Sequence, residues 1–509
     1  MTKAVPIMVQ GTSSDAGKSV LVTALCRIFA QDGYSTAPFK SQNMALNSYV
    51  TVDGKEIGRA QGVQAESAGI VATTDMNPIL IKPSRGHEAQ IVVHGVPYQT
   101  MQAVEYRKSF FQTGLQIITE AYQRLADQYD RVVIEGAGSP AEINLNDREL
   151  VNMRVARLAN APVILIADIE RGGVFASLVG TLQLMEPADR ERVIGVVINR
   201  FRGDLTLLQP GLEWFEQYTN VPVLGVIPFL PDLWIDAEDS LVLHKYEGHA
   251  TSKKEIDIAV IQYPRISNFT DVDPFMVEPD CRVRYITRLD ELGEPDVIIL
   301  PGSKNTLEDM LFLQQQGLES RIMELHQSGH TFVIGLCGGY QMLGRAILDP
   351  YMVESPQERM EGLGLIPSLT TLEKTKTTIL SKGSFGFDGI LHELTGYEIH
   401  MGQTVYPEGN PHPFIQLANR QDGYFDPEKR VLGTYFHGLF HNDVFRHQLL
   451  DSVRTCKGLS ALPARPSFVA LREAGFDYLA DQVRKHVQIE RINEQIIQFQ
   501  KKKEMNTTS

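Results

Sequence analysis

A chain of 509 residues with 43% hydrophobic residues is long enough for two or three domains, each with its own core. Its formal net charge of −14 argues against nucleic acid or an anionic membrane surface as a partner. The four cysteines lie far apart without a Cys-x-x-Cys pair, so neither a disulfide framework nor a zinc site is predicted, in keeping with a reducing cytoplasm. The apolar core of the first residues is too short for a signal peptide, and no apolar run is long enough to span a membrane.

Near the start of the chain, a short apolar segment (residues 6–10) leads into GTSSDAGKS at residues 11–19 and then into a helical pattern that reaches about residue 30. A strand, a glycine-containing loop with Gly-Lys-Ser, and a helix form the arrangement that cradles phosphate groups. Lys18 would neutralise phosphate charge, and the Ser19 hydroxyl would reach Mg²⁺. The alternative is a simple turn between strand and helix. The predicted nucleotide-binding residues of this loop are Gly11, Thr12, Asp15, Gly17, Lys18 and Ser19.

Two further apolar segments end in an acid. Residues 131–138 read RVVIEGAG and residues 162–168 read PVILIAD. A carboxylate at the carboxyl end of a strand beside a phosphate-binding loop is a natural ligand for Mg²⁺, so Glu135 and Asp168 join Ser19 as predicted metal ligands. For Glu135, the alternative is an acid that caps a turn.

Apolar strands that alternate with helical patterns predict the fold class, which is α/β with two doubly wound domains. Ligands of such sheets lie at the carboxyl ends of the strands, where these motifs fall. A second alternation starts near residue 255, after a polar stretch (residues 241–254) that we interpret as a linker. The predicted domains are residues 1–246, residues 254–450, and a C-terminal extension at residues 451–509. Its last part, residues 479–503, predicts an exposed or partner-packed helix before a disordered tail.

Residues 331–344 read TFVIGLCGGYQMLG and have the layout of a nucleophile elbow, in which a strand and a helix flank a sharp turn with one reactive side chain. Cys337 occupies the turn. The glycines relieve crowding, and the start of the helix favours a thiolate. The alternative is a buried core cysteine.

The elbow resembles the nucleophile site of class I glutamine amidotransferases, which implies that Cys337 attacks glutamine. The sequence PGSKNT at residues 301–306 is similar to the loop that supplies an oxyanion donor in that family, so Gly302 and Gly338 are the implied oxyanion residues. The sequence GTYFHGLF at residues 433–440 resembles the motif that carries the base, which implies His437; His400 is a weaker, structural or substrate-side candidate.

Many members of that family carry an acid two residues after the histidine, where this chain has Leu439. Asp443 or a backbone carbonyl would then have to orient His437. Because His437 would then be held less firmly, we expect slow glutamine hydrolysis until the corrinoid and ATP bind.

The phosphate loop resembles that of dethiobiotin synthetase-like amidoligases, which share its longer spacing. With FKSQNMALNS at residues 39–48 and the later GRAQ and QA, the chain resembles the cobyric acid synthase family within the cobalamin-pathway amidotransferases. The resemblance spans roughly residues 5–450. It implies that the 39–48 region faces a corrinoid and that residues 168–176 (DIERGGVFA) hold phosphate or a substrate carboxylate. The implied substrate residues are Gln42, Asn43, Asn47 and Arg171, and the further nucleotide residues are Lys40 and Asn199.

The implied activity is ATP- and glutamine-dependent amidation of four propionate carboxylates (b, d, e and g) of adenosylcobyrinic acid a,c-diamide, with ATP and Mg²⁺ required and glutamine as the nitrogen donor. One alternative is the related synthase that makes the a,c-diamide, which should lack the FKSQNMALNS stretch. Another is a P-loop ATPase switch protein of the ParA type with an inactive amidotransferase-like domain. A third is a binding module with neither activity.

Overall fold

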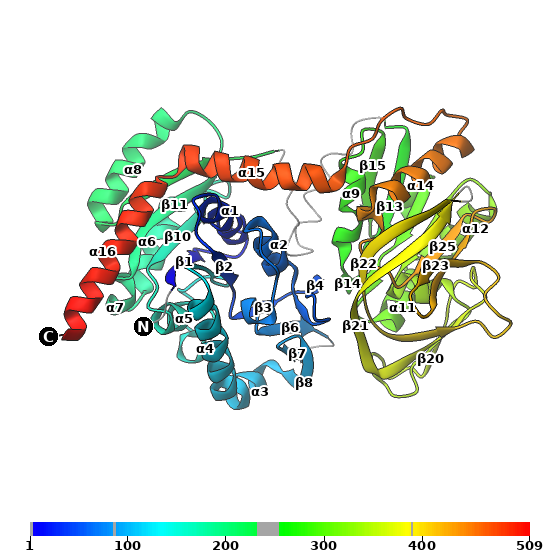
Figure 1. Cartoon of the computed structure of the whole chain (residues 1–509), viewed down its shortest axis with the longest axis horizontal. Helices are drawn as coiled ribbons and strands as arrows, with labels where there is room; N and C mark the ends of the chain where they lie inside the picture. Colours follow the sequence, from blue (N-terminus) through cyan, green and yellow to red (C-terminus); the bar gives the residue numbers. More distant parts are fainter. Residues whose placement is uncertain (1–3, 85–87, 232–253, 388–389, 509) are drawn as a thin grey trace. The chain divides into compact units, whose positions relative to one another are not determined.

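The computed structural model describes residues 4–84, 88–231, 254–387 and 390–508, and the chain divides into two compact units (Figure 1). The first unit comprises Met1–Ala45, Glu56–Ile235 and Arg472–Ser509, and the second comprises Leu46–Lys55 and Asp236–Leu471. The predicted linker, residues 241–254, lies outside the described residues except for Lys254. Among the described residues, no helix combines the length and the apolar character needed to cross a membrane.

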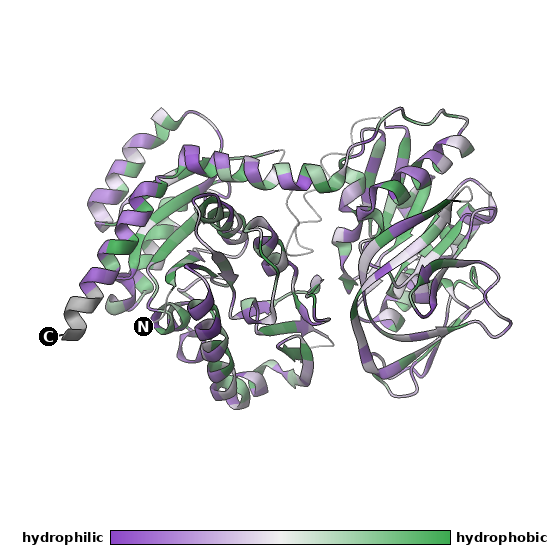
Figure 2. Ribbon diagram, in the orientation of Figure 1, coloured by the Kyte–Doolittle hydropathy of each residue, from purple (hydrophilic) through white to green (hydrophobic). Residues whose placement is uncertain are grey.

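A six-stranded parallel sheet forms the centre of the first unit, and three of its strands coincide with the apolar segments at residues 6–10, 131–138 and 162–168. Figure 2 shows apolar residues concentrated in these strands. They are buried because helices cover the sheet, as the near-continuous apolar runs predict. In sheet order the strands are β12 (Val223–Pro228), β11 (Val193–Phe201), β10 (Val163–Asp168), β1 (Val5–Gly11), β9 (Arg131–Glu135) and β2 (Thr36–Phe39).

Helices follow most strands of this parallel sheet along the chain, whereas the smaller strands of the first unit form a sheet of their own. Helix α1 (Lys18–Gln31) begins at the phosphate loop and buries Leu21, Leu25 and Phe29 in the core. The longer helices after it are α2 (Arg59–Ser67), α4 (Phe111–Gln128), α6 (Val174–Leu184) and α8 (Leu205–Thr219). A separate four-stranded sheet contains β3 (Gln42–Met44), β6 (Ile79–Pro83), β7 (Glu88–Val93) and β8 (Val96–Gln102).

The two C-terminal helices, α15 (Phe468–His486) and α16 (Ile489–Thr508), correct one prediction. Residues 479–503 are neither an exposed helix nor a helix reserved for a partner. Ile492 and Ile496 of α16 are fully buried in the same core cluster as strand residues of the first unit. The Gln488 N–H also donates to the Leu224 carbonyl of β12 at 2.8 Å. The apolar residues of α16 therefore pack in the core of the first unit. The predicted extension, residues 451–509, divides between the two units after Leu471.

The second unit is built on an eleven-stranded mixed sheet. Its parallel part contains β15 (Cys281–Ile286), β13 (Ile256–Ile261), β16 (Val297–Leu300), β18 (Phe332–Leu336) and β25 (Val431–Thr434). Antiparallel strands continue the sheet beyond β25, an extension that the strand–helix alternation of the sequence does not predict. The longest of these are β21 (Leu369–Phe387) and β22 (Ile390–Val405), and β24 (Gln421–Asp426) and β23 (Pro413–Leu417) lead to them.

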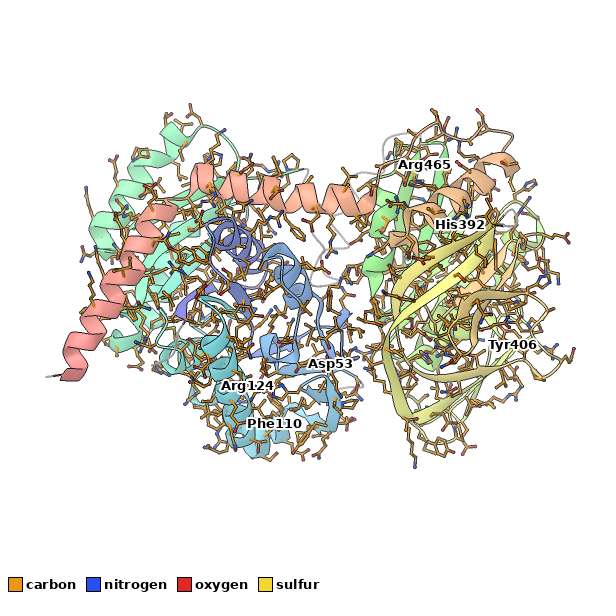
Figure 3. All side chains as sticks on the ribbon, viewed as in Figure 1. Asp53, Phe110, Arg124, His392, Tyr406 and Arg465 are labelled. Carbon is orange, nitrogen blue, oxygen red and sulfur yellow. The ribbon has the colours of Figure 1, made fainter. Side chains whose placement is uncertain are left out.

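A buried ionic cluster explains why residues 451–471 belong to the second unit. The Arg465 guanidinium (labelled in Figure 3) lies 2.8 Å from Glu278 Oε2 and 2.9 Å from Asp280 Oδ1. Arg454, on helix α14 (Asp443–Cys456), also pairs with Asp280 at 2.8 Å. Opposite charges that are buried together satisfy one another, whereas removing one partner would leave a costly unpaired charge.

Candidate active sites

The predicted elbow is present in the second unit. Strand β18 ends at Leu336, Cys337 has a φ of 51°, and helix α13 (Gly338–Leu343) starts immediately afterwards. A positive φ in a non-glycine residue is uncommon and marks a strained, functionally important turn. Close packing forces glycine at Gly339, because a Cβ there would lie 1.9 Å from the Leu300 carbonyl oxygen. The turn thus fixes the Cys337 side chain at the carboxyl end of the parallel strands.

His437 lies beside the elbow and is completely buried. It follows β25, the strand that pairs with β18. Its Nδ1 atom is 2.7 Å from Asp271 Oδ2, and the other carboxylate oxygen accepts a hydrogen bond from the Gly438 N–H at 2.8 Å. Burial favours the neutral imidazole, but the charge and hydrogen bond of Asp271, with a hydrogen bond to Cys337, outweigh it and raise the pKa of His437 to about 10. His437 keeps the pKa of Asp271 below its ordinary value, despite the burial of that carboxyl.

Asp271 corrects the prediction about the orienting group of His437. Leu439, at the position where an acid was expected, packs in an apolar cluster and does not orient His437. Asp443 does not replace it: its Oδ1 atom accepts hydrogen bonds from Arg446 at 2.9 Å and from the Phe468 N–H at 3.0 Å. The orienting carboxylate instead comes from a 3₁₀ turn, Phe269–Val272, which follows strand β13. His437 is therefore held by a buried carboxylate, and the premise of weak support was wrong.

The two segments that carry the predicted oxyanion residues adjoin this site. Gly302 and Ser303 form the short strand β17, which pairs with β14 (Ile266–Ser267). A Cβ on Gly302 would lie 2.9 Å from the Ser267 carbonyl oxygen, with His437 Cε1 at 3.5 Å, and a Cβ on Gly338 would lie 2.8 Å from the Ser303 backbone nitrogen. Both positions therefore favour glycine. Gly338 directly follows Cys337, and the role of the two N–H groups as oxyanion donors stays a prediction.

The phosphate loop of the first unit connects β1 to α1 as predicted. Gly17 has a φ of 105°, and a Cβ there would lie 2.1 Å from Asn199 Nδ2, so glycine is required at this position. Lys18 is buried, and its Nζ atom donates to the Ser13 carbonyl at 2.9 Å, which folds the side chain back over the loop. The Asn199 amide donates to the Ala16 carbonyl at 3.0 Å and supports the loop from β11. Thr12 donates its N–H to the Ile166 carbonyl at 3.0 Å.

Glu135 ends strand β9 beside this loop and is buried. Its Oε1 atom accepts hydrogen bonds from the Ser19 hydroxyl and from Lys40 Nζ, both at 2.9 Å, and Gln64 donates to Oε2 at 2.5 Å. The structure therefore brings together three residues predicted from separate motifs: Ser19, Lys40 and Glu135.

Asp168 ends strand β10, which pairs with β1 on the side opposite β9, and its carboxylate contacts arginines. Its Oδ2 atom lies 2.7 Å from Arg200 Nη1 and 3.8 Å from Arg171 Nε, and its Oδ1 atom accepts the Glu170 N–H at 2.8 Å. Arg171 is also 3.5 Å from Asp15 Oδ2. Asp168 therefore anchors the arginines that adjoin the phosphate loop, and its predicted contact with a metal stays a prediction.

Two family models match the chain in the same order as these sites. The CobQ/CobB/MinD/ParA nucleotide-binding domain matches residues 7–242, and the CobB/CobQ-like glutamine amidotransferase domain matches residues 257–445. A cobyric acid synthase of Geobacillus sp. is 62% identical over 99% of this chain and 100% of the relative. Those of Yersinia enterocolitica and Moorella thermoacetica are each 50% identical, over 98% and 96% of this chain and 99% and 96% of their own lengths.

The chain belongs to the cobyric acid synthase family. It is therefore an amidotransferase-type ligase with a nucleotide-binding domain and a glutamine amidotransferase domain. This membership confirms the resemblance found in the sequence, and it rules out the interpretation as a ParA-type switch protein.

The stretch that pointed to the cobyric acid synthase family, residues 39–48, divides between the two units, and its contact with a corrinoid stays a prediction. Gln42 accepts a hydrogen bond from the Tyr106 hydroxyl at 2.6 Å, and Asn43 donates to Gln61 at 2.9 Å, both within the first unit. Asn47 instead belongs to the second unit, where its Oδ1 atom accepts the Phe269 N–H at 3.2 Å. The sequence offered no signal that the stretch would divide after Ala45.

The donor set at the phosphate loop fits a magnesium ion. Ser19 Oγ and Glu135 Oε1 are 2.9 Å apart and offer hard oxygen ligands side by side. In the described parts of the chain, no three His, Cys, Asp or Glu side chains are grouped as a complete metal site. Mg²⁺ is usually held by one or two protein oxygens together with substrate phosphates and water, and this pair suits that pattern.

His400, the weaker histidine candidate, stacks on Tyr435 with ring centroids 3.8 Å apart. Its Nδ1 atom is 2.8 Å from the Gly402 carbonyl oxygen. These contacts favour the structural interpretation of His400. The base that lies with the elbow is His437.

Proposed function

We propose that the protein uses ATP and glutamine to convert the b, d, e and g propionate carboxylates of adenosylcobyrinic acid a,c-diamide into amides, which gives adenosylcobyric acid. Membership of the cobyric acid synthase family supports this assignment. The observation that carries it is the pairing of a buried Cys337–His437–Asp271 site with a phosphate-binding loop in one chain. A glutaminase produces ammonia, and the ATP site activates the acid that receives it.

In the glutaminase reaction, the Cys337 thiol gives its proton to Nε2 of His437, and the sulfur attacks the side-chain carbonyl of glutamine. The Gly302 and Gly338 N–H groups would stabilise the oxyanion. His437 gives its proton to the departing ammonia, and a thioester remains on Cys337. Water then attacks the thioester as His437 accepts its proton, and His437 passes that proton to the leaving sulfur, which releases glutamate and regenerates the thiol. Asp271 holds the imidazole in the tautomer with hydrogen on Nδ1 and stabilises its protonated form.

In the synthetase reaction, an oxygen of the substrate carboxylate attacks the γ-phosphorus of ATP, and ADP leaves. This step is needed because a free carboxylate is a poor electrophile. Ammonia then attacks the acyl phosphate, and inorganic phosphate departs as the amide forms. Lys18 and the loop N–H groups bind the phosphates, and Mg²⁺ held by Ser19 and Glu135 would supply further charge stabilisation. We expect this chemistry in the cytoplasm, where the free thiols of the described residues stay reduced.

The test is amide formation on a purified corrinoid, followed by mass spectrometry with glutamine labelled with ¹⁵N in its side-chain amide. We expect four labelled amides on the a,c-diamide, formed only with ATP. Cobyrinic acid, the substrate of the related synthase, is the comparison. Amidation of cobyrinic acid at its a and c carboxylates, without reaction of the a,c-diamide, would contradict the proposal.

A further inference from the structure

A short segment from the N-terminal part of the chain packs against the glutaminase site. The segment Leu46–Lys55, here called the strap, belongs to the second unit. Val50 of the strap forms an apolar cluster with Tyr397 and Ile399 of β22. Both partners belong to the site: the Tyr397 ring stacks on His437 at 5.0 Å between centroids, and the Ile399 carbonyl accepts the Cys337 thiol at 3.5 Å.

Asn268 connects the strap to the catalytic histidine. The Ser48 N–H of the strap donates to Asn268 Oδ1 at 3.0 Å, and Asn268 Nδ2 lies 3.4 Å from His437 Nε2. Because the Ser48 N–H can only donate, the Asn268 atom that faces it must be the oxygen. The NH₂ group of Asn268 is therefore the one that faces His437.

This orientation of the Asn268 amide affects the protonation state of His437. With Nδ1–H bonded to Asp271, the neutral imidazole has one lone pair left, on Nε2, and this lone pair must accept the Cys337 proton. The NH₂ group of Asn268 points at the same lone pair and competes for it. Once Nε2 is protonated, it faces another donor and the contact becomes unfavourable. Asn268 therefore favours the neutral histidine, while Asp271 favours the protonated one.

We propose that Asn268 is a positioning residue through which the strap restrains glutamine hydrolysis until the corrinoid and ATP are bound. The inference rests on the proposed function. The strap follows β3 directly in the chain, and β3 carries the predicted substrate residues Gln42 and Asn43. A shift of the strap withdraws the Ser48 N–H, the amide of Asn268 turns away, and Nε2 becomes available to Cys337. Ammonia is then released mainly when an acceptor is present.

The first test is the glutaminase rate of Asn268→Gly with glutamine alone. Asn268 has a φ of 51°, which glycine adopts without strain, so the variant removes the amide and keeps the backbone. We expect the basal rate to rise about 2- to 10-fold, the range of one hydrogen bond, and the stimulation by ATP plus the a,c-diamide to shrink accordingly. The matched control is Val52→Ala, an exposed strap residue, which should keep the wild-type rate. An unchanged or lower basal rate in Asn268→Gly, or an equal rise in the control, overturns the inference.

A second variant tests the strap from its own side. Asn47→Ala removes the acceptor of the Phe269 N–H and should also raise the basal rate. The assay contains neither ATP nor corrinoid, so weaker substrate binding cannot produce that rise. A basal rate at or below that of the wild type contradicts control by the strap. Amidation by the wild-type enzyme is measured in parallel. No amidation would contradict the proposed function, whereas normal amidation without these changes in glutaminase rate would contradict only the inference about Asn268 and the strap.

The pH dependence of Cys337 alkylation distinguishes a positioning role of Asn268 from a purely structural one. The titratable groups that face or neighbour His437 are Asp271, Cys337, Tyr397 and, through Asp271, His441. All of them remain in Asn268→Gly. Loss of a donor that opposes the protonated histidine should move the onset of Cys337 alkylation by iodoacetamide to lower pH, with wild-type thermal stability as the folding control. An onset at the wild-type pH or above it overturns the assignment.

Discussion

The carboxylate of Asp271 lies 2.7 Å from Nδ1 of His437, although 166 residues separate the two along the chain. The contact completes a catalytic site for which the sequence offered only a cysteine and a histidine. It also changes the expected glutaminase chemistry, because a buried carboxylate fixes the imidazole tautomer. A low basal rate, if measured, would then have to come from Asn268 and the strap and not from a missing acid.

Asp271→Asn should lower glutamine hydrolysis by ~10²–10⁴, because the amide neither fixes the tautomer nor stabilises the imidazolium. Amidation with ammonium at alkaline pH should persist, since that reaction bypasses the glutaminase. Glutaminase and ammonia-dependent synthesis are measured on the same preparation. The control is Asp443→Asn, which changes the acid suggested by the sequence; its glutaminase should stay near the wild-type rate, and a large loss there would contradict the assignment to Asp271.

The same pair makes stability depend on pH. Because the pKa of His437 is raised to about 10, its contribution is fully present below the ordinary imidazole pKa and is lost as the pH rises through about 10. The pKa of Asp271 is lowered, so its contribution is lost as the pH falls through that depressed value. The difference in unfolding free energy between wild type and Asp271→Asn, from urea titrations, should therefore shrink above about pH 9. A constant difference up to pH 11 would show that the pair is not ionised as described.

Cys337→Ala should abolish glutamine-dependent synthesis and leave synthesis with ammonium at alkaline pH. The reason is that the variant removes the nucleophile but no part of the phosphate loop. Corrinoid amidation is followed with each nitrogen source. If both activities vanish while the circular dichroism spectrum is unchanged, Cys337 has a role beyond glutamine hydrolysis.

Lys18→Ala and Glu135→Gln should show the opposite pattern, with amidation lost for both nitrogen sources. Loss of one well-placed group that stabilises charge commonly lowers a rate by ~10²–10³. Glu135→Gln also removes the negative charge beside Ser19 and Lys40, so the dependence on Mg²⁺ concentration should move to higher values. Near-normal turnover with ammonium in both variants would exclude this loop as the ATP site.

Helix α16 should contribute measurably to the stability of the first unit. Ile496 is fully buried in its core, and Ile496→Ala should lower the unfolding free energy by ~2–5 kcal/mol. The neighbouring Ile497 is 48% exposed, and Ile497→Ala should have little effect. Urea unfolding followed by circular dichroism compares the two. Equal effects would mean that α16 does not pack as described.

The sequence by itself determined the parts of this protein that are local in the chain. The phosphate loop needs Gly17, Lys18 and Ser19 in consecutive positions, and the elbow needs Cys337 between a strand and a helix, so each can be recognised from a few neighbouring residues. The apolar runs of the parallel strands likewise predicted the α/β class, because such strands are buried on both faces.

Only the tertiary structure decided the contacts between residues that are distant in the chain. Asp271 has no motif around it, and it reaches His437 because the turn after β13 lies at the same sheet edge as the end of β25. Residues 46–48 close the predicted substrate-facing stretch, yet they pack with the second unit because Asn47 and Ser48 hydrogen-bond to Phe269 and Asn268. The burial of α16 depends in the same way on a surface built by strands several hundred residues earlier, because an apolar periodicity predicts a buried face but does not identify what covers it.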